Sequence, residues 1–167
     1  MDEGKLMAIL SQSDMKKVCL SLNQDGKIVV FTNGCYDLLH RGHVELLQQA
    51  RKLGDCLVVG LNSDSSVEKL KGTGRPLQSE ENRAAVLEAL SAVDYVTIFE
   101  EETPLELICK LRPNVLVKGA DYSKEEIVGG EEVNSWGGQV VRIPLIKGEA
   151  TRDIIRRALA LGVDKTS

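Results

Sequence analysis

Short apolar runs alternate with amphipathic stretches along most of this chain, and this alternation limits its possible folds more than any other feature. Five short runs are largely apolar, which is typical of β-strands covered on both faces in a parallel sheet. The predicted strands are residues 28–32, 56–61, 95–99, 115–117 and 139–143.

Helix signals separate these strands. The apolar stripe that begins at Val44 indicates a helix that stops at Gly54, because glycine is a favourable helix C-cap. The segment 103–106 (Thr-Pro-Leu-Glu) carries a cap, a proline at the first position and a glutamate at the third, and its helix must end before Pro113. The other predicted helix starts are Ser79, the capping-box spacing from Ser123 to Glu126, and Thr151.

The order of these elements predicts an α/β fold: a Rossmann-like, doubly wound parallel sheet of five strands with right-handed crossovers. Ligands of such sheets bind at the carboxyl ends of the strands, near the switch in strand order. We assign residues 27–167 to this domain. Residues 1–26 form an N-terminal helical extension, with apolar spacing that fits one or two short helices and offers a subunit interface.

Composition narrows the range of partners. The 25 acidic and 21 basic side chains give a net charge of -4, which argues against a nucleic-acid partner, since such proteins present basic surfaces. No apolar run approaches the length of a membrane-spanning helix, and the first residues lack the order of a secretory signal. No two of the four cysteines form a CxxC pair, so a zinc site is not expected. We therefore expect a cytoplasmic protein without a membrane partner.

The two histidines, His40 and His43, lie three residues apart where the first predicted strand passes into a helix. At this spacing they project on one side of the first helical turn. Gly34 lets the backbone approach a ligand, and Gly42 removes a side chain where the helix begins. Backbone N–H groups and the helix dipole favour phosphate there. A zinc site would need a third ligand, and none is suitably spaced. The alternative to a phosphate site is therefore a pair of ordinary surface histidines.

The segment 33–43 (Asn-Gly-Cys-Tyr-Asp-Leu-Leu-His-Arg-Gly-His) resembles the HxGH signature of the nucleotidyltransferase superfamily, and its Asp-Leu-Leu is similar to the cytidylyltransferase-type branch. Further blocks resemble the adenylyltransferase domain family of ADP-heptose synthases, over about residues 27–160. These blocks are residues 61–67, 70–76, 82–87, 103–108, 116–122, 136–138 and 143–145, of which Lys-Gly-Ala-Asp-Tyr and Trp-Gly-Gly discriminate best.

This resemblance implies transfer of AMP from ATP to D-glycero-β-D-manno-heptose 1-phosphate, with Mg²⁺ held by the phosphates rather than by dedicated protein ligands. It also implies a separate sugar kinase that supplies the sugar 1-phosphate, and it allows a homodimer. One alternative is a cytidylyltransferase acting on glycerol 3-phosphate, although that branch usually has an arginine in place of Leu145. Another is a nucleotide-binding module without turnover.

The resemblance assigns roles to individual residues. The expected catalytic residues are His40, His43 and Lys71, and Lys71 is expected to lie with Arg75 in a loop flanked by glycines. The expected nucleotide-binding residues are Thr32, Asn33, Gly34, Asp37, Gly42, Arg83, Lys118, Gly119, Asp121 and Thr151. Asn62, Arg75, Trp136 and Arg152 are the candidate substrate-binding residues.

Some of these assignments have a structural alternative. Asp37 orients the loop or the ribose, or makes a buried structural hydrogen bond. Arg83 lies near the phosphates, or forms a helix-surface salt bridge with Glu80. Trp136 is a lid or sugar-stacking residue, or a packed core tryptophan. The family commonly has Gly-x-Ser-Thr-Thr before the last helix, whereas residues 148–152 are Gly-Glu-Ala-Thr-Arg, so phosphate binding there departs from the family pattern.

Overall fold

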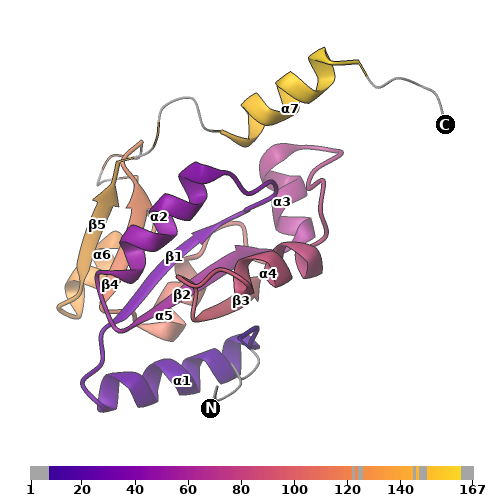
Figure 1. The fold of residues 1–167 in the computed structure, drawn as a ribbon. Helices are drawn as coiled ribbons and strands as arrows, with labels where there is room; N and C mark the ends of the chain where they lie inside the picture. The colour runs from indigo at the N-terminus through magenta and orange to yellow at the C-terminus, as the bar shows by residue number, and fades with distance from the viewer. Residues whose placement is uncertain (1–7, 122, 124–125, 145, 147–149, 163–167) are drawn as a thin grey trace, which may run out of the picture.

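The computed structural model describes residues 8–121, 123, 126–144, 146 and 150–162. Five strands form one fully parallel sheet in the order β3-β2-β1-β4-β5 (Figure 1). They are β1 (Val29–Gly34), β2 (Cys56–Asn62), β3 (Tyr95–Phe99), β4 (Val115–Gly119) and β5 (Gln139–Ile143). The predicted fold class is confirmed, and each predicted strand is present. The structure extends the strands β1 and β4 by two residues at their carboxyl ends, which is where a ligand site is expected.

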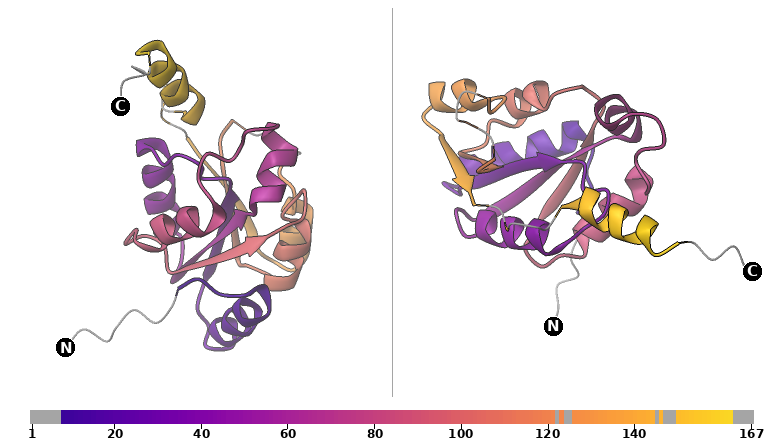
Figure 2. Two further views of the ribbon diagram at one scale, coloured as in Figure 1. Left: turned by 90° about the vertical axis from the view of Figure 1, so that its right-hand side faces the viewer. Right: turned by 90° about the horizontal axis from the view of Figure 1, so that it is seen from above.

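Helices cover both faces of this sheet. They are α1 (Gln12–Gln24), α2 (Arg41–Arg51), α3 (Asp64–Lys71), α4 (Glu80–Glu88), α5 (Leu105–Leu111), α6 (Gly130–Ser135) and α7 (Thr151–Ala160). The helices α2 and α4 pack on one face, and α1, α5 and α6 pack on the other (Figures 1 and 2). The helix α7 lies beyond the carboxyl edge of the sheet, above α2 in Figure 1. No described helix is long and apolar enough to cross a bilayer.

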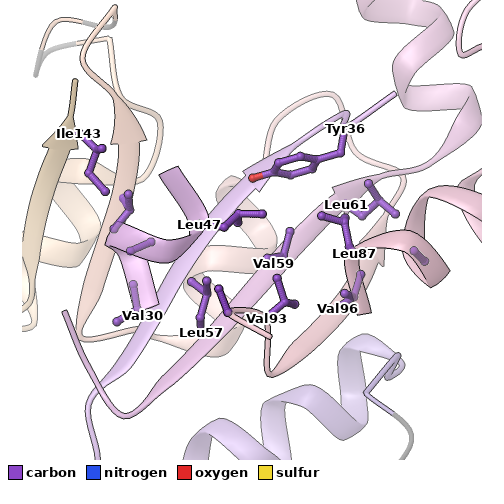
Figure 3. Packing of buried hydrophobic residues seen from close by; sticks show 14 of the residues in the cluster. Val30, Tyr36, Leu47, Leu57, Val59, Leu61, Leu87, Val93, Val96 and Ile143 are labelled. Carbon is purple, nitrogen blue, oxygen red and sulfur yellow. The ribbon is translucent and has the colours of Figure 1, made fainter. Parts of the chain in front are cut away.

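Alternate side chains of the central strands enter two separate cores. Val30 and Leu57 point to the side of α2 and α4, where they join Leu47 and Leu87 (Figure 3). Their neighbours in β1 and β2, such as Phe31, enter the opposite core, which the helices α1, α5 and α6 close. Both faces of each central strand are therefore dry, which explains why these strands are continuously apolar rather than alternating in the sequence.

The N-terminal extension is part of the second core. Met15 and Cys19, on the inner side of α1, are completely buried in the same cluster as Phe31 and Leu107. The expectation that the apolar residues of the extension supply a subunit interface is therefore wrong for this side of α1, because these residues pack against their own sheet. The division of the chain at residue 26 remains a prediction.

Several predicted helix starts are shifted. Ser79 caps α4 as expected, since its Oγ accepts a hydrogen bond from the Asn82 N–H (3.3 Å). At α5, however, Pro104 rather than Thr103 occupies the N-cap position. The capping-box contact at Ser123 also forms, with the Ser123 N–H donating to Glu126 Oε2 (2.9 Å). This contact closes a turn rather than a helix, and α6 begins only at Gly130.

Two further expectations about local structure were wrong. Lys71 was predicted to lie in a loop, but it is the last residue of α3, a short polar helix whose N-cap is Ser63. Gly54 was predicted to cap α2, but α2 already ends at Arg51. A Cβ at Gly54 would lie 2.6 Å from the Ile28 carbonyl oxygen, so glycine is required there by the close approach of β1.

Candidate functional site

The candidate site lies where β1 and β4 meet, at the switch in strand order. The helix α2 follows β1 on one face of the sheet, and the connection after β4 leads to α6 on the other face. In sheets of this kind the ligand crevice lies outside the carboxyl ends of the strands at such a switch point, so we take this edge as the candidate crevice. Lys118 in β4 spans the two strands, because its Nζ donates to the carbonyl oxygen of Asn33 in β1 (3.4 Å).

The two histidines lie at the first turn of α2, beside this switch point. His40 is the N-cap of the helix, and its Nδ1 accepts a hydrogen bond from the Gly42 N–H (3.1 Å). Since Nδ1 is an acceptor, neutral His40 carries its proton on Nε2, which makes Nε2 a hydrogen-bond donor. The ring of His43 stacks on that of His40, with centroids 3.8 Å apart. The motif therefore presents two imidazoles at the positive end of a helix dipole, which favours an anion.

His43 is partly buried. Burial, with a smaller contribution from nearby His40, lowers the pKa of His43 to about 4, so the ring is neutral near pH 7. Its Nδ1 is buried and has no hydrogen-bond partner among the described residues. The ring of Tyr36 also lies against it, with centroids 5.1 Å apart. A neutral, desolvated imidazole of this kind gains most from a hydrogen bond to an arriving anion.

Thr32 and Gly34 shape the end of β1 from within. The Thr32 hydroxyl donates to the Val117 carbonyl oxygen (3.0 Å), so this side chain joins β1 to β4 and leaves only the backbone of Thr32 for a ligand. A Cβ at Gly34 would lie 3.0 Å from the ring of Tyr36. A side chain at position 34 would therefore crowd the ring of Tyr36, which itself lies against His43.

Lys118 provides positive charge on the β4 side. Burial lowers the pKa of Lys118 to about 8, and the attraction of Cys35 and Asp121 only partly opposes this effect. Gly119, the last residue of β4, is buried, and Asp121 is exposed in the turn that follows. At neutral pH this lysine is therefore mostly charged but poorly hydrated, which favours contact with a phosphate.

Asp37, which follows Tyr36, makes structural hydrogen bonds. One carboxylate oxygen accepts from the Nε of Arg75 (2.7 Å), and the other accepts from the N–H groups of Leu77 (2.9 Å) and Gln78 (3.0 Å). Burial alone would raise the pKa of Asp37, but these hydrogen bonds outweigh burial and hold the pKa below its ordinary value. Both Asp37 and Arg75 are thus engaged with protein groups.

Arg83 does not form the surface salt bridge with Glu80 that was one of its two interpretations. Its side chain is completely buried and ion-paired with Asp64 (2.7 Å), while Glu80 accepts a hydrogen bond from the backbone N–H of Asp64 (2.7 Å). The other hydrogen bonds of Arg83 end on backbone carbonyls. Its predicted contact with nucleotide stays a prediction.

The remaining predicted residues surround this crevice unevenly. Asn62 is buried and donates to the Ser66 hydroxyl (2.9 Å), so it helps to fix α3. The Thr151 hydroxyl, at the first residue of α7, donates to the Leu38 carbonyl oxygen (3.1 Å), which connects α7 to the histidine segment. Arg152 is exposed on α7. Gly148 and Glu149, in the segment that departs from the family pattern, lie outside the described residues.

The structure contradicts a substrate-binding role for Trp136 at this site. The indole Nε1 donates to the Pro113 carbonyl oxygen (3.0 Å), and Pro113 precedes β4 at the amino edge of the sheet. The guanidinium of Arg112 lies 5.1 Å from the ring centroid. Trp136 therefore packs at the opposite edge from the histidines, where it lines a cavity of about 310 Å³ with Lys16, Leu20 and other residues of α1 and α5. Its alternative interpretation, packing, is the one observed.

Sequence reasoning missed the main-chain groups that organise the site. The carbonyl of Cys35 accepts a hydrogen bond from Arg83. The N–H groups of Leu77 and Gln78 donate to the Asp37 carboxylate. Main-chain donors and acceptors leave no signature in a sequence, so no signal could have identified them. Among the described residues, no group of three or more His, Cys, Asp or Glu side chains is placed to hold a metal ion.

Comparisons with known sequences place this arrangement in a family. The family model described as cytidylyltransferase-like matches residues 31–151. The curated protein named Bifunctional protein HldE from Syntrophotalea carbinolica is 60% identical over 134 residues, which are 80% of this chain and 27% of that protein. The protein of the same name from Trichlorobacter lovleyi is 49% identical over 157 residues, 94% of this chain and 32% of its own length. The chain thus spans about a third or less of these relatives.

Solved structures agree with the fold. A lipopolysaccharide core biosynthesis protein from Thermoplasma volcanium has a TM-score of 0.61 and 28% identity, and the match covers 74% of this chain and 100% of that one. Pantothenate synthetase from Thermus thermophilus has the same TM-score at 18% identity, covering 89% of this chain and 67% of its own, and supports the fold alone. With its HxGH motif at the switch point and a family model that matches most of its length, the chain belongs to the cytidylyltransferase-like family.

Proposed function

We propose that this protein transfers AMP from ATP to D-glycero-β-D-manno-heptose 1-phosphate, with formation of ADP-heptose and pyrophosphate. The observation that carries this proposal is the stacked pair His40 and His43 at the N-terminus of α2, across the switch point from Lys118. The high identity to the proteins named HldE, and the likeness to a lipopolysaccharide core biosynthesis protein, support a sugar phosphate as the acceptor.

The proposed reaction is an in-line displacement at phosphorus. A phosphate oxygen of the sugar 1-phosphate attacks the α-phosphorus of ATP, the bond from the α-phosphorus to the bridging oxygen breaks, and pyrophosphate leaves with that electron pair. No protein group needs to form a covalent bond, so catalysis consists of alignment and charge stabilisation. The histidines donate to the non-bridging oxygens, where charge develops in the transition state, and the positive end of the α2 dipole also stabilises that charge.

The charges around the crevice fit this chemistry. Lys118 lies on the β4 side, and Lys71 ends α3 close enough for its charge to influence the pKa of Cys35. Backbone groups of Asn33 and Gly34 line the path between them. Mg²⁺ enters with ATP as its counter-ion and neutralises phosphate charge. We place the reaction in the cytoplasm, with the sugar 1-phosphate produced by a sugar kinase.

The family description favours one other activity, transfer of CMP from CTP to a phosphorylated alcohol such as glycerol 3-phosphate. Pyrophosphate release separates the two. ATP, CTP and GTP are each combined with heptose 1-phosphate and with glycerol 3-phosphate, in the presence and absence of Mg²⁺. We expect turnover only with ATP, heptose 1-phosphate and Mg²⁺.

Two results would contradict the proposal. Turnover with CTP but not with ATP or GTP would show that the protein is a cytidylyltransferase rather than an adenylyltransferase. Nucleotide binding without turnover for any pair would leave a binding module. Arg51→Lys serves as a control variant. Arg51 lies at the far end of α2 from the histidines and pairs with Asp94 (2.8 Å), so its replacement should leave turnover unchanged.

A further inference from the structure

Arg83 is surrounded by acceptors that belong to the protein. Its Nε donates to the Gln78 carbonyl oxygen (3.0 Å), its Nη1 to the carbonyl oxygens of Cys35 (2.7 Å) and Asn62 (2.8 Å), and its Nη2 to Asp64 Oδ1 (2.7 Å). A guanidinium has five N–H donors, and these bonds engage all but one of them. With a side chain that is 0% exposed, Arg83 has little capacity left for a substrate.

The acceptors of Arg83 lie on segments that border the site. Cys35 begins the HxGH loop (residues 35–40), directly after β1, and Asn62 ends the neighbouring strand β2. These strands are paired up to Gly34 and Leu61. By binding both carbonyls with one nitrogen, Arg83 fixes the carboxyl end of β1 against that of β2 at the residue where the HxGH loop departs.

Asp37 makes the complementary contacts from the HxGH loop itself. Its carboxylate binds the segment 75–78, here called the strap, through Arg75 and the N–H groups of Leu77 and Gln78. In return the side-chain amide of Gln78 donates to the Asp37 carbonyl oxygen (2.8 Å). The strap is therefore held twice: Arg83 binds a carbonyl of Gln78, and Asp37 binds the amides.

The strap also connects the helix that ends at Lys71 with the helix that carries Arg83. These helices are α3 and α4, respectively. The HxGH loop leads into His40 and His43. A change in Arg83 would therefore alter the position of the histidines relative to Lys71, even though the hydrogen bonds of Arg83 described above reach none of these three residues.

We propose that Arg83 is a positioning residue for the transfer reaction, which holds the HxGH loop in its phosphate-binding shape. Asp37, in the loop itself, is its counterpart and binds the strap. The kinetic part of this inference rests on the proposed function. The single ammonium of a lysine cannot reach the four acceptors that the planar guanidinium of Arg83 binds. Arg83→Lys therefore keeps the positive charge and loses most of these hydrogen bonds.

The test uses the fact that the chain has only two histidines. In the full-length protein without nucleotide, NMR follows the imidazole proton signals of His40 and His43 against pH. In Arg83→Lys we expect the pKa of His43 to rise from about 4 toward its ordinary value of 6.5, because a relaxed loop admits water. The matched control Arg51→Lys should leave the titration unchanged.

Kinetics complete the test. We expect Arg83→Lys to lower kcat at least about tenfold, with a smaller change in KM for ATP, because misplaced histidines lose contacts made in the transition state. An unchanged His43 titration with a raised KM for ATP would identify Arg83 as a direct nucleotide ligand and overturn the inference. A shifted titration with unchanged kcat would also overturn it.

Failure of the proposed function is distinguishable from failure of this inference. If the wild-type protein shows no turnover with any pair, the proposed function fails, while the histidine titration still decides whether Arg83 shapes the loop. If Arg83→Lys does not fold, the isosteric variant Asp37→Asn replaces it. Asp37→Asn should shift the His43 titration in the same direction, and an unchanged titration would contradict the role of the pair.

Discussion

The imidazole rings of His40 and His43 lie stacked, with centroids 3.8 Å apart and planes inclined by 28°. Burial opposes protonation of His43, and a positive charge on His40 at this distance opposes it further, so the pKa of His43 falls to about 4. Neutral His43 can therefore donate a hydrogen bond without placing an unpaired charge at the site. A phosphate beside the rings would favour protonation of His43, because its negative charge offsets part of the cost of burial.

Replacement of His43 by alanine should lower kcat by roughly two to three orders of magnitude, because removal of one donor to a developing negative charge has effects of this size. The protein should remain folded, since His43 lies at the end of α2 rather than in either core. Pyrophosphate release and circular dichroism measure the two properties. A folded variant with near-normal kcat would refute the assigned role.

Stability should fall as the solution becomes acidic, because His43 titrates differently in the two states. Its pKa is about 4 in the folded protein and near 6.5 when unfolded, so between these values only the unfolded chain binds the proton. The contribution of His43 is complete above pH 6.5 and is lost as the pH falls to about 4. Urea unfolding at several pH values should show a shallower acid loss for His43→Gln than for the wild type. Parallel curves for the two proteins would contradict this account.

Deprotonation of Lys118 should lower kcat/KM for ATP at alkaline pH. Its pKa of about 8 means that the positive charge beside Asn33 disappears above that pH in the free enzyme. Because kcat/KM reports ionisations of the free enzyme, kcat/KM for ATP should decline with an apparent pKa near 8. Lys118→Arg should retain charge and move the decline to higher pH. An identical alkaline limb in both proteins would assign the decline to another group.

Trp136→Phe should leave the kinetics unchanged, because Trp136 lies at the amino edge of the sheet. We expect kcat and both KM values to stay within about twofold of the wild type. The free energy of unfolding should fall by about 1 kcal/mol, since the bond from Nε1 to Pro113 is lost while the ring is largely kept. Urea unfolding followed by circular dichroism measures this loss. A large rise in KM for the sugar phosphate would restore the substrate-binding interpretation.

The sequence predicted most of the fold because the information was local. Largely apolar runs marked the strands, and the Ser79 cap marked the start of α4. The helix α3 escaped prediction because it is short, and its only described buried residues are Ser66 and Val67. Likewise, Ser123 and Glu126 formed their predicted contact without a helix, since a capping contact alone does not supply the packing that a helix needs.

The site was predictable only in part, for the same reason. His40 and His43 could be located because the motif, the strand end and the helix start are contiguous in the sequence. The contacts of Arg83 and Trp136 depend on segments distant in the chain, such as Cys35 and Pro113, and no local pattern specifies them. The motif therefore located the candidate site, while long-range packing determined which other side chains lie beside it.

The bond from Lys118 to Asn33 joins residues 85 positions apart, and it forms only where β4 pairs with β1. Contacts of such separation close a large loop and are slow to form during folding. A nascent chain that has already exposed its HxGH motif still lacks half of its crevice until β4 has been synthesised and inserted beside β1. Nucleotide binding would therefore report that the central sheet is complete. It would distinguish fully folded molecules from partly folded ones that contain the same motif.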